Sequence, residues 1–155
     1  MAKHNVPMTK AGLEKLQQEL KELESVKRDK AKQRIKRARS FCDFHEDSEY
    51  EAALQEYDAI EKRISEINYM TQQAEIIEKT SNTTVELGST VTFKEIPDGN
   101  TETYTIVGTA EADPFEAKIS NVSPIAKSLI GAKAKDEITV KTPAGNRQVK
   151  IINIT

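Results

Sequence analysis

Residues 13–40 read LEKLQQELKELESVKRDKAKQRIKRARS, and the spacing of their apolar side chains decides the fold of the first half of the chain. Apolar residues recur at steps that mostly alternate between three and four, which is the seam of a helical coiled coil. The members of this seam are Leu13, Leu16, Leu20, Leu23, Val26, Ala31, Ile35 and Ala38. No proline or glycine lies between Leu13 and Lys79, so nothing there forces a helix to break. The pattern therefore predicts long amphipathic helices.

A second seam of similar spacing follows the first, and it predicts a partner helix. Its members are Tyr50, Ala53, Leu54, Tyr57, Ile60, Ile64, Ile67, Ala74 and Ile77. Residues 40–48, between the seams, are mostly small or charged, so we expect the chain to reverse there and the helices to pair antiparallel. With roughly 30 residues in each arm, such a hairpin would be about 45 Å long. Thr9 is a suitable N-cap for the first helix, and Met8 can pack on Leu13 as a hydrophobic staple.

The second half of the chain has the period of β-strands. The polar stretch 79–84 separates it from the first half, so we expect a hairpin domain over residues 1–79 and a globular domain over residues 80–155. Apolar residues alternate with polar ones as in half-buried strands. The alternating pairs are Val91 with Phe93, Tyr104 with Ile106, Ile138 with Val140, and Val149 with Ile151.

Turn and helix signals complete the prediction for this globular domain. Residues 97–100 (PDGN) and 143–146 (PAGN) carry the proline and glycine of tight turns. Ser123 is a candidate N-cap, with Pro124 at the first helical position and Gly131 after the end of one short helix. The fold class is therefore α+β: an N-terminal antiparallel helical hairpin followed by a small β-sheet domain with one short helix.

Composition limits the function to a small protein that acts in the cytoplasm. The chain has 155 residues, of which 31% are charged and 5% aromatic, and its formal net charge is -2. This length is too short for a large enzyme core. The single cysteine, Cys42, cannot form an internal disulfide, and the N-terminus lacks the apolar run of a secretory signal. No apolar stretch approaches the roughly 20 residues that span a bilayer.

Several blocks of sequence, in the same order, resemble the Gre family of bacterial transcript-cleavage factors, of the GreA type. These blocks are PMTKAGLEKLQQEL (7–20), ARSFCDFHEDSEYEAA (38–53), YTIVGTAEADPFEAKIS (104–120), SPIAKSLIG (123–131) and VKTPAG (140–145). The resemblance implies a C-terminal domain similar to the FK506-binding fold without isomerase activity. It also implies a monomeric accessory factor, not an enzyme, which docks on bacterial RNA polymerase and inserts its coiled coil into the secondary channel. DNA binding belongs to the same expectation, although the residues do not indicate where DNA would be contacted.

The resemblance also implies where the chemistry lies. Asp43 and Glu46 occupy the two acidic positions of the family's hairpin-tip motif, whose role is to stimulate hydrolysis of the RNA 3′ end in backtracked complexes. The two lie three positions apart, so a helical turn would present both carboxylates on one side. Mg²⁺ usually takes one or two carboxylates beside water and phosphate oxygens. We therefore expect Mg²⁺ to be held jointly with the polymerase. On spacing alone, a solvated acidic turn remains the alternative.

A run of basic residues precedes the predicted tip. It contains Lys27, Arg28, Lys30, Lys32, Arg34, Lys36, Arg37 and Arg39, interrupted by Asp29. By resemblance, Lys32, Lys36, Arg37 and Arg39 would hold the backbone of the nascent RNA 3′ end through salt-sensitive contacts. The alternative is a solvated helix face, partly neutralised by glutamates of the second helix. Those glutamates are Glu56, Glu61 and Glu66.

Some positions depart from the family pattern and keep a second function open. Cys42 and Phe44 replace the usual glycine and leucine, and Asp47 replaces asparagine, which adds a charge beside the acidic pair. The polymerase-docking residues implied by the resemblance are Val122, Ser123 and Pro124, and Val122 replaces the usual aspartate or asparagine. A diverged paralogue, which occupies the channel with little or no cleavage stimulation, is the alternative. Cys42 and His45 have the spacing of half a zinc site, but no second pair follows.

Overall fold

The computed structural model describes residues 5–40 and 48–155, which form two compact units. One unit is the helical stretch Leu13–Gln73, and the other combines the start of the chain, up to Gly12, with Ala74–Thr155. The division differs from the predicted boundary at residue 79, because the start of the chain and the residues after the last hairpin helix both belong to the unit of the sheet.

A short parallel strand pair explains this difference. β1 (Val6–Met8) pairs with β2 (Ala74–Ile76), and the Ile77 amide donates to the Met8 carbonyl at 3.0 Å. The seam had predicted helix through Ala74 and Ile77, and that part of the prediction is wrong. Their backbone groups bond across to the N-terminal strand instead of to the preceding helical turn.

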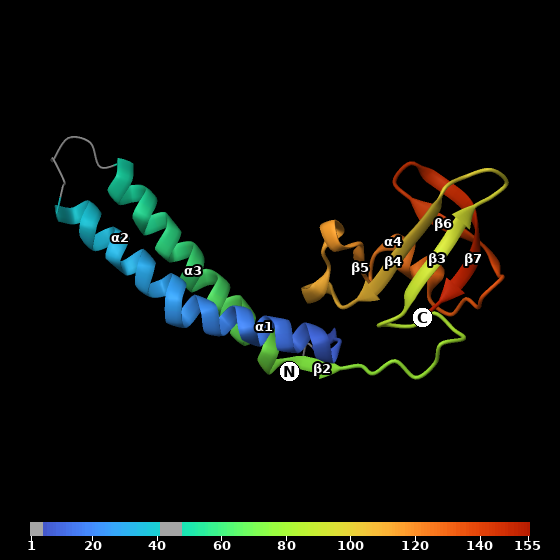
Figure 1. Ribbon diagram of the computed structural model, residues 1–155, viewed down its shortest axis with the longest axis horizontal. Coiled ribbons are helices and arrows are strands. Elements are labelled where there is room, and N and C mark those ends of the chain that lie inside the picture. The colour runs from blue at the N-terminus through green and yellow to red at the C-terminus, as the bar shows by residue number, and fades with distance from the viewer. Residues whose placement is uncertain (1–4, 41–47) are drawn as a thin grey trace. The chain divides into compact units, whose positions relative to one another are not determined.

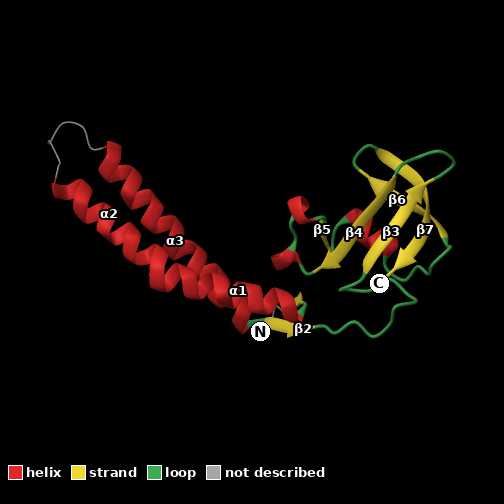
Figure 2. Cartoon of the chain, in the orientation of Figure 1, coloured by secondary structure: helices red, strands yellow, loops and turns green. Residues whose placement is uncertain are grey.

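The helical unit is the predicted hairpin (Figures 1 and 2). α1 (Lys10–Glu22) leads through a π-helical turn (Leu23–Lys27) into α2 (Arg28–Ser40), and α3 (Ser48–Gln72) returns beside them. Thr9 caps α1 as predicted, because its hydroxyl accepts a hydrogen bond from the Gly12 amide at 3.1 Å. The first two helical segments therefore act as one arm and α3 as the other.

The π-helical turn corrects one member of the predicted seam. The Arg28 amide donates to the Leu23 carbonyl, five positions earlier, so this turn takes up one extra residue. Val26 is consequently 42% exposed, and its assignment to the seam is wrong. Leu23 and Ala31 are both buried, eight positions apart. Seam positions repeat every seven residues, so one inserted residue lengthens the step from Leu23 to Ala31 to eight and keeps Ala31 in the seam.

The other unit is built on a five-stranded mixed sheet of order β5-β4-β3-β7-β6. Its strands are β3 (Thr90–Glu95), β4 (Thr101–Val107), β5 (Lys118–Ser120), β6 (Glu137–Thr142) and β7 (Gly145–Ile154). β4 and β5 run parallel, and the other neighbours are antiparallel. Four of these strands follow the predicted alternation. The short edge strand β5 was not predicted.

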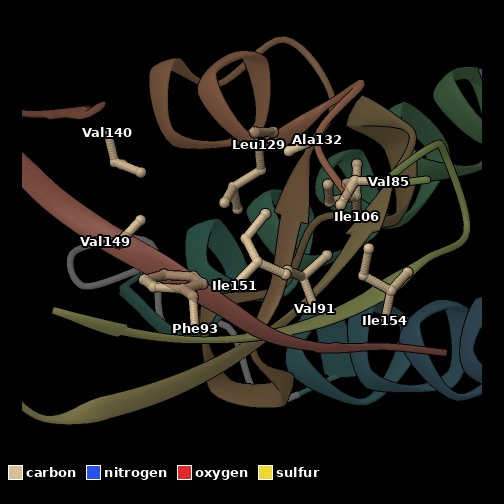
Figure 3. Close-up of a cluster of buried hydrophobic side chains, with 11 residues drawn as sticks. Val85, Val91, Phe93, Ile106, Leu129, Ala132, Val140, Val149, Ile151 and Ile154 are labelled. Atoms are coloured by element: carbon tan, nitrogen blue, oxygen red, sulfur yellow. The ribbon is translucent and has the colours of Figure 1, made fainter. Parts of the chain in front are cut away.

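One helix, α4 (Pro124–Leu129), packs its buried side chains into the core of this unit. Figure 3 shows Leu129 directed from this helix toward Ile151 of β7. The core consists of Val85, Val91, Phe93, Ile106, Ala126, Leu129, Ala132, Val140, Val149, Ile151 and Ile154. Ser123 caps the helix and Pro124 begins it, as predicted. The predicted α+β class, a helical hairpin followed by a sheet with one short helix, is confirmed.

Candidate functional site

The acidic pair implied by the resemblance, Asp43 and Glu46, lies in residues 41–47, outside the described part of the chain. The neighbouring positions that depart from the family pattern lie there too. The structure describes the helix ends on both sides of this segment, which are the end of α2 at Ser40 and the start of α3 at Ser48. These ends frame the segment that carries the predicted chemistry.

Arg34 of α2 bridges two carboxylates of α3 near these ends. Its Nε donates to Oε1 of Glu49 at 2.9 Å, and its Nη1 donates to Oε2 of Glu56. Hydrogen bonds first to Glu49 and then to Glu56 raise the pKa of the Arg34 guanidinium above its already high value, so it is always charged. A planar guanidinium with several donors suits this double contact better than an ammonium group. Arg34 therefore joins the two helices at two levels.

A second contact lies closer to the tip. The guanidinium of Arg39 lies 5.9 Å from the centre of the Tyr50 ring, across the hairpin. A cation this close to an aromatic face is attracted by the ring quadrupole. The ring of Tyr50 is half-buried, whereas Arg39 is exposed. The contact thus pairs a predicted phosphate-binding residue with the aromatic side chain at the start of α3.

Further from the tip, two bidentate ion pairs continue the connection between the arms. Arg28 donates to both carboxylate oxygens of Glu61, at 2.6 and 3.0 Å, and Arg63 does the same to Glu19, at 2.7 and 3.0 Å. The guanidinium of Arg63 holds the pKa of Glu19 below its ordinary value. Arg63 also lies 3.6 Å from Glu66 of its own helix. Glu66 was predicted to help neutralise the basic run, and the ion pair that it forms is with Arg63 of its own helix.

The pairs divide the basic run into two groups. Arg28 and Arg34 bind carboxylates of α3, whereas the four predicted phosphate-binding residues are exposed. Those four are Lys32, Lys36, Arg37 and Arg39. Three of them follow at intervals of four and three, so they share one side of α2. Within residues 5–40 and 48–155, none of the four forms an ion pair. An open hollow lined by Gln33, Lys36, Arg37 and Ser40 lies among them.

The predicted docking residues lie at the turn before α4. Val122 is 54% exposed, and its amide donates to the Ser120 hydroxyl at 3.3 Å. The hydroxyl of Ser123 accepts from the Ala126 amide at 3.2 Å, so this side chain is occupied in capping. Pro124 is exposed at the first helical position. The turn therefore presents Val122 and Pro124 on a backbone that Ser123 fixes.

Sequence reasoning missed Glu111, in the short helical turn η2 (Thr109–Glu111). Its carboxylate accepts from the Thr9 amide at 2.8 Å, the Gly108 amide at 3.2 Å and the Thr9 hydroxyl. A Cβ atom on Gly12 would lie 2.0 Å from Glu111 Oε1, so any larger residue there would require the Glu111 side chain to shift. Thr9 and Glu111 are 102 positions apart, and no local pattern indicates their contact.

Across residues 5–40 and 48–155, no three His, Cys, Asp or Glu side chains gather where they could hold a metal ion. No helix in the same part of the chain is long and apolar enough to cross a membrane.

Comparison with known proteins gives matches over both halves of the chain. Residues 6–76 match the family model "Transcription elongation factor, N-terminal", and residues 80–155 match "Transcription elongation factor, GreA/GreB, C-term". The chain is 54% identical to "Transcription elongation factor GreA" of Bacillus subtilis over 157 residues, which cover 100% of both proteins.

The chain is also similar to a second relative and to a solved structure. The protein of the same name from Geobacillus kaustophilus is 56% identical over 150 residues, covering 96% of this chain and 95% of the relative. A solved structure titled "Structure of the transcription factor Gfh1" shares 33% identity over 99% of both chains, with a TM-score of 0.48. Both family models and the full-length relatives agree, and the chain belongs to the GreA/GreB family of transcription elongation factors.

Proposed function

We propose that this elongation factor binds bacterial RNA polymerase, inserts its hairpin into the secondary channel and stimulates hydrolytic cleavage of the RNA 3′ end in backtracked complexes. As a transcription elongation factor, the chain is an accessory protein and not itself an enzyme. The observation that carries the proposal has two parts. Basic side chains of α2 are exposed, and Arg34 joins α2 to α3 close in sequence to Asp43 and Glu46. We propose that the factor acts in the cytoplasm and as a monomer.

The role of the acidic pair follows from the chemistry of its donors. Asp43 and Glu46 supply oxygen ligands, which suit Mg²⁺. Two carboxylates make a weak site alone, so the polymerase would have to supply the remaining ligands. When bound there, the ion would activate a water molecule for attack on the phosphodiester. The carboxylates of this chain would help to orient that water, and Arg34 joins α2 to α3 through Glu49 and Glu56.

The basic face supplies attraction for RNA. Lys32, Lys36 and Arg37 are exposed on α2 and form no ion pair among the described residues, although Lys32 is near enough to Glu61 to lower the pKa of that carboxyl. An unpaired cation attracts a phosphodiester more strongly than one already bound to glutamate. We therefore assign these residues, together with Arg39, to the backbone of the extruded RNA 3′ end.

The second candidate is a channel occupant that regulates polymerase with little or no cleavage. It is favoured by Cys42, Phe44 and Asp47, where the tip departs from the family pattern. An extra carboxylate at position 47 can compete for the metal or raise the pKa of a neighbouring acid. Binding to polymerase is common to both candidates, and cleavage separates them.

A stalled, backtracked elongation complex with 5′-labelled RNA tests the proposal. Addition of the full-length factor should shorten the RNA, and Asp43→Asn or Glu46→Gln should reduce the cleavage rate by about a hundredfold or more while binding stays within about twofold. Asp58→Asn is the matched control, because Asp58 is an exposed acid on α3 away from the tip. Binding without cleavage by the parent would favour the channel occupant. Cleavage by the parent that neither tip variant reduces would remove both carboxylates from the mechanism.

A further inference from the structure

Phe115 is the most exposed large apolar side chain of the described residues. It is 100% exposed in the short helical turn η3 (Pro114–Glu116), whereas the next most exposed apolar side chains, Val122 and Tyr69, are 54% and 52% exposed. Full exposure of an aromatic ring gains nothing for folding, since the hydrophobic effect favours its removal from water. Such a side chain is a candidate anchor for another molecule.

The loop around Phe115 is built to hold this ring outward. The Asp113 carboxylate accepts from the Phe115 amide at 2.9 Å, and Pro114 fixes the first position of the turn. Ala117 adopts the left-handed conformation, with φ of 53°, to close it. Asp113 and Lys118 exchange two backbone hydrogen bonds, at 3.0 and 2.9 Å. The ring is therefore presented by a defined turn and not by a loose end.

The position of this loop connects it with the docking turn. β5 is the edge strand of the sheet, and the Phe115 turn ends directly before it. Val122 and Pro124 follow its other end. A strand of three residues spans about 10 Å, so the two apolar projections flank one sheet edge at the spacing of a single protein contact.

Charges around the ring indicate what it would meet. Residues 109–118 contain three acidic side chains and one basic one: Glu111, Asp113, Glu116 and Lys118. Lys118 Nζ lies 2.7 Å from Glu116, which leaves an acidic excess around the ring. Complementary surfaces bring opposite charges together. A matching partner would offer an apolar hollow bordered by lysine or arginine.

We propose that Phe115 is a second docking anchor, which inserts into a basic-rimmed apolar hollow on RNA polymerase and extends the docking surface from Val122–Pro124 along β5. The inference rests on the proposed function, since it names a residue that the polymerase would contact. Glu116 contributes to the approach of the two proteins and Phe115 to the lifetime of the complex.

Equilibrium binding of full-length factor to purified RNA polymerase tests this assignment. Phe115→Ala should raise Kd by roughly ten- to thirtyfold. Glu116→Gln should raise it by a smaller factor that disappears at high salt. Ile152→Ala is the matched control, because Ile152 is 50% exposed on β7, and it should change Kd by less than about twofold. Unfolding curves of Phe115→Ala should match the parent.

The outcomes separate the inference from the proposed function. No binding by the parent overturns both. Binding by the parent that Phe115→Ala leaves unchanged overturns only the anchor. An equal loss in Phe115→Ala and Ile152→Ala also overturns it, since any exposed apolar residue would then suffice. If Phe115→Ala instead abolishes self-association of the factor and leaves polymerase binding intact, the ring contacts a second copy and the inference is wrong.

Discussion

Leu129 links the core of the sheet unit to the proposed docking turn, so its truncation gives a quantitative test of how that turn is supported. Its side chain is 0% exposed and points from α4 toward Ile151 (Figure 3). Leu129→Ala removes the transfer free energy of three carbon atoms and leaves a cavity that strands β3 and β7 cannot easily fill. We expect a loss of about 3–4 kcal/mol in the free energy of unfolding of this unit.

The measurement must report on the sheet unit alone, because the hairpin can unfold separately and the chain contains no tryptophan. Amide hydrogen exchange of core residues in β3 and β7 provides this. Each 1.4 kcal/mol changes the population of the open state tenfold, so protection should fall by roughly two to three orders of magnitude. Amides of α3 in the hairpin should keep their protection.

Ile130→Ala is the control, since Ile130 is the adjacent residue, also aliphatic, and is 42% exposed. Ile130→Ala should lower the free energy of unfolding by no more than about a third of the loss caused by Leu129→Ala. A Leu129→Ala variant that loses less than about 1 kcal/mol, or loses no more than Ile130→Ala, would refute the reasoning that α4 is held by this side chain. Polymerase binding should weaken only under conditions where the unit is partly unfolded.

Three other predictions concern the hairpin and the start of the chain. The double variant Lys36→Glu with Arg37→Glu should reduce the slope of log affinity for single-stranded RNA against log salt by roughly 0.7 per lost phosphate contact. Lys21→Glu, on another exposed part of the hairpin, is the control. If the double variant keeps the same slope as this control, the basic residues are only solvated and do not bind phosphate. Because Arg63 lowers the pKa of Glu19, their pair stabilises the hairpin above the ordinary glutamate pKa of about 4.3 and is lost as pH falls below it. Acid titration of α-helical circular dichroism should therefore flatten in Arg63→Gln. Gly108→Ala should lower the melting temperature of the sheet unit, since the new Cβ would lie 1.9 Å from the Pro7 carbonyl oxygen. A melting temperature equal to the parent's would show that the segment before α1 shifts freely.

Local patterns predicted the parts of the fold that local interactions determine. The helix seams, the four longer strands and the cap at Ser123 each follow from neighbouring residues. The missed elements depend on distant partners. β1 and β2 have three residues each, and their pairing across 68 positions has no periodic signal of its own. In the sequence, the only sign of the π-helical turn is the step of five residues from Val26 to Ala31, which does not fit the steps of three and four of the seam.

The candidate site shows the same division. Resemblance supplied Asp43, Glu46 and the four phosphate-binding residues, and the residue types alone left each with a structural alternative. Sequence did not separate Arg34 from its basic neighbours, although Arg34 is the one that bridges Glu49 and Glu56. The sequence shows that the run is basic, but it does not show which carboxylate each basic residue binds, because that depends on how both helices are rotated about their axes.

The ion pairs also explain why one hairpin can be both stable and strongly charged on one side. Two helices alone cannot enclose a thick apolar core, and small residues such as Ala31 and Ala53 are among the buried residues of the hairpin. Bidentate arginine pairs therefore join the arms beside that thin seam, and they consume carboxylates that could otherwise neutralise the lysines. Because the ion pairs between α2 and α3 are formed by Arg28 and Arg34, the charges of Lys36 and Arg37 remain available to an outside anion. Arg28 and Arg34 hold the two arms together, so replacing Arg34 by lysine should loosen the arms even though the net charge stays the same.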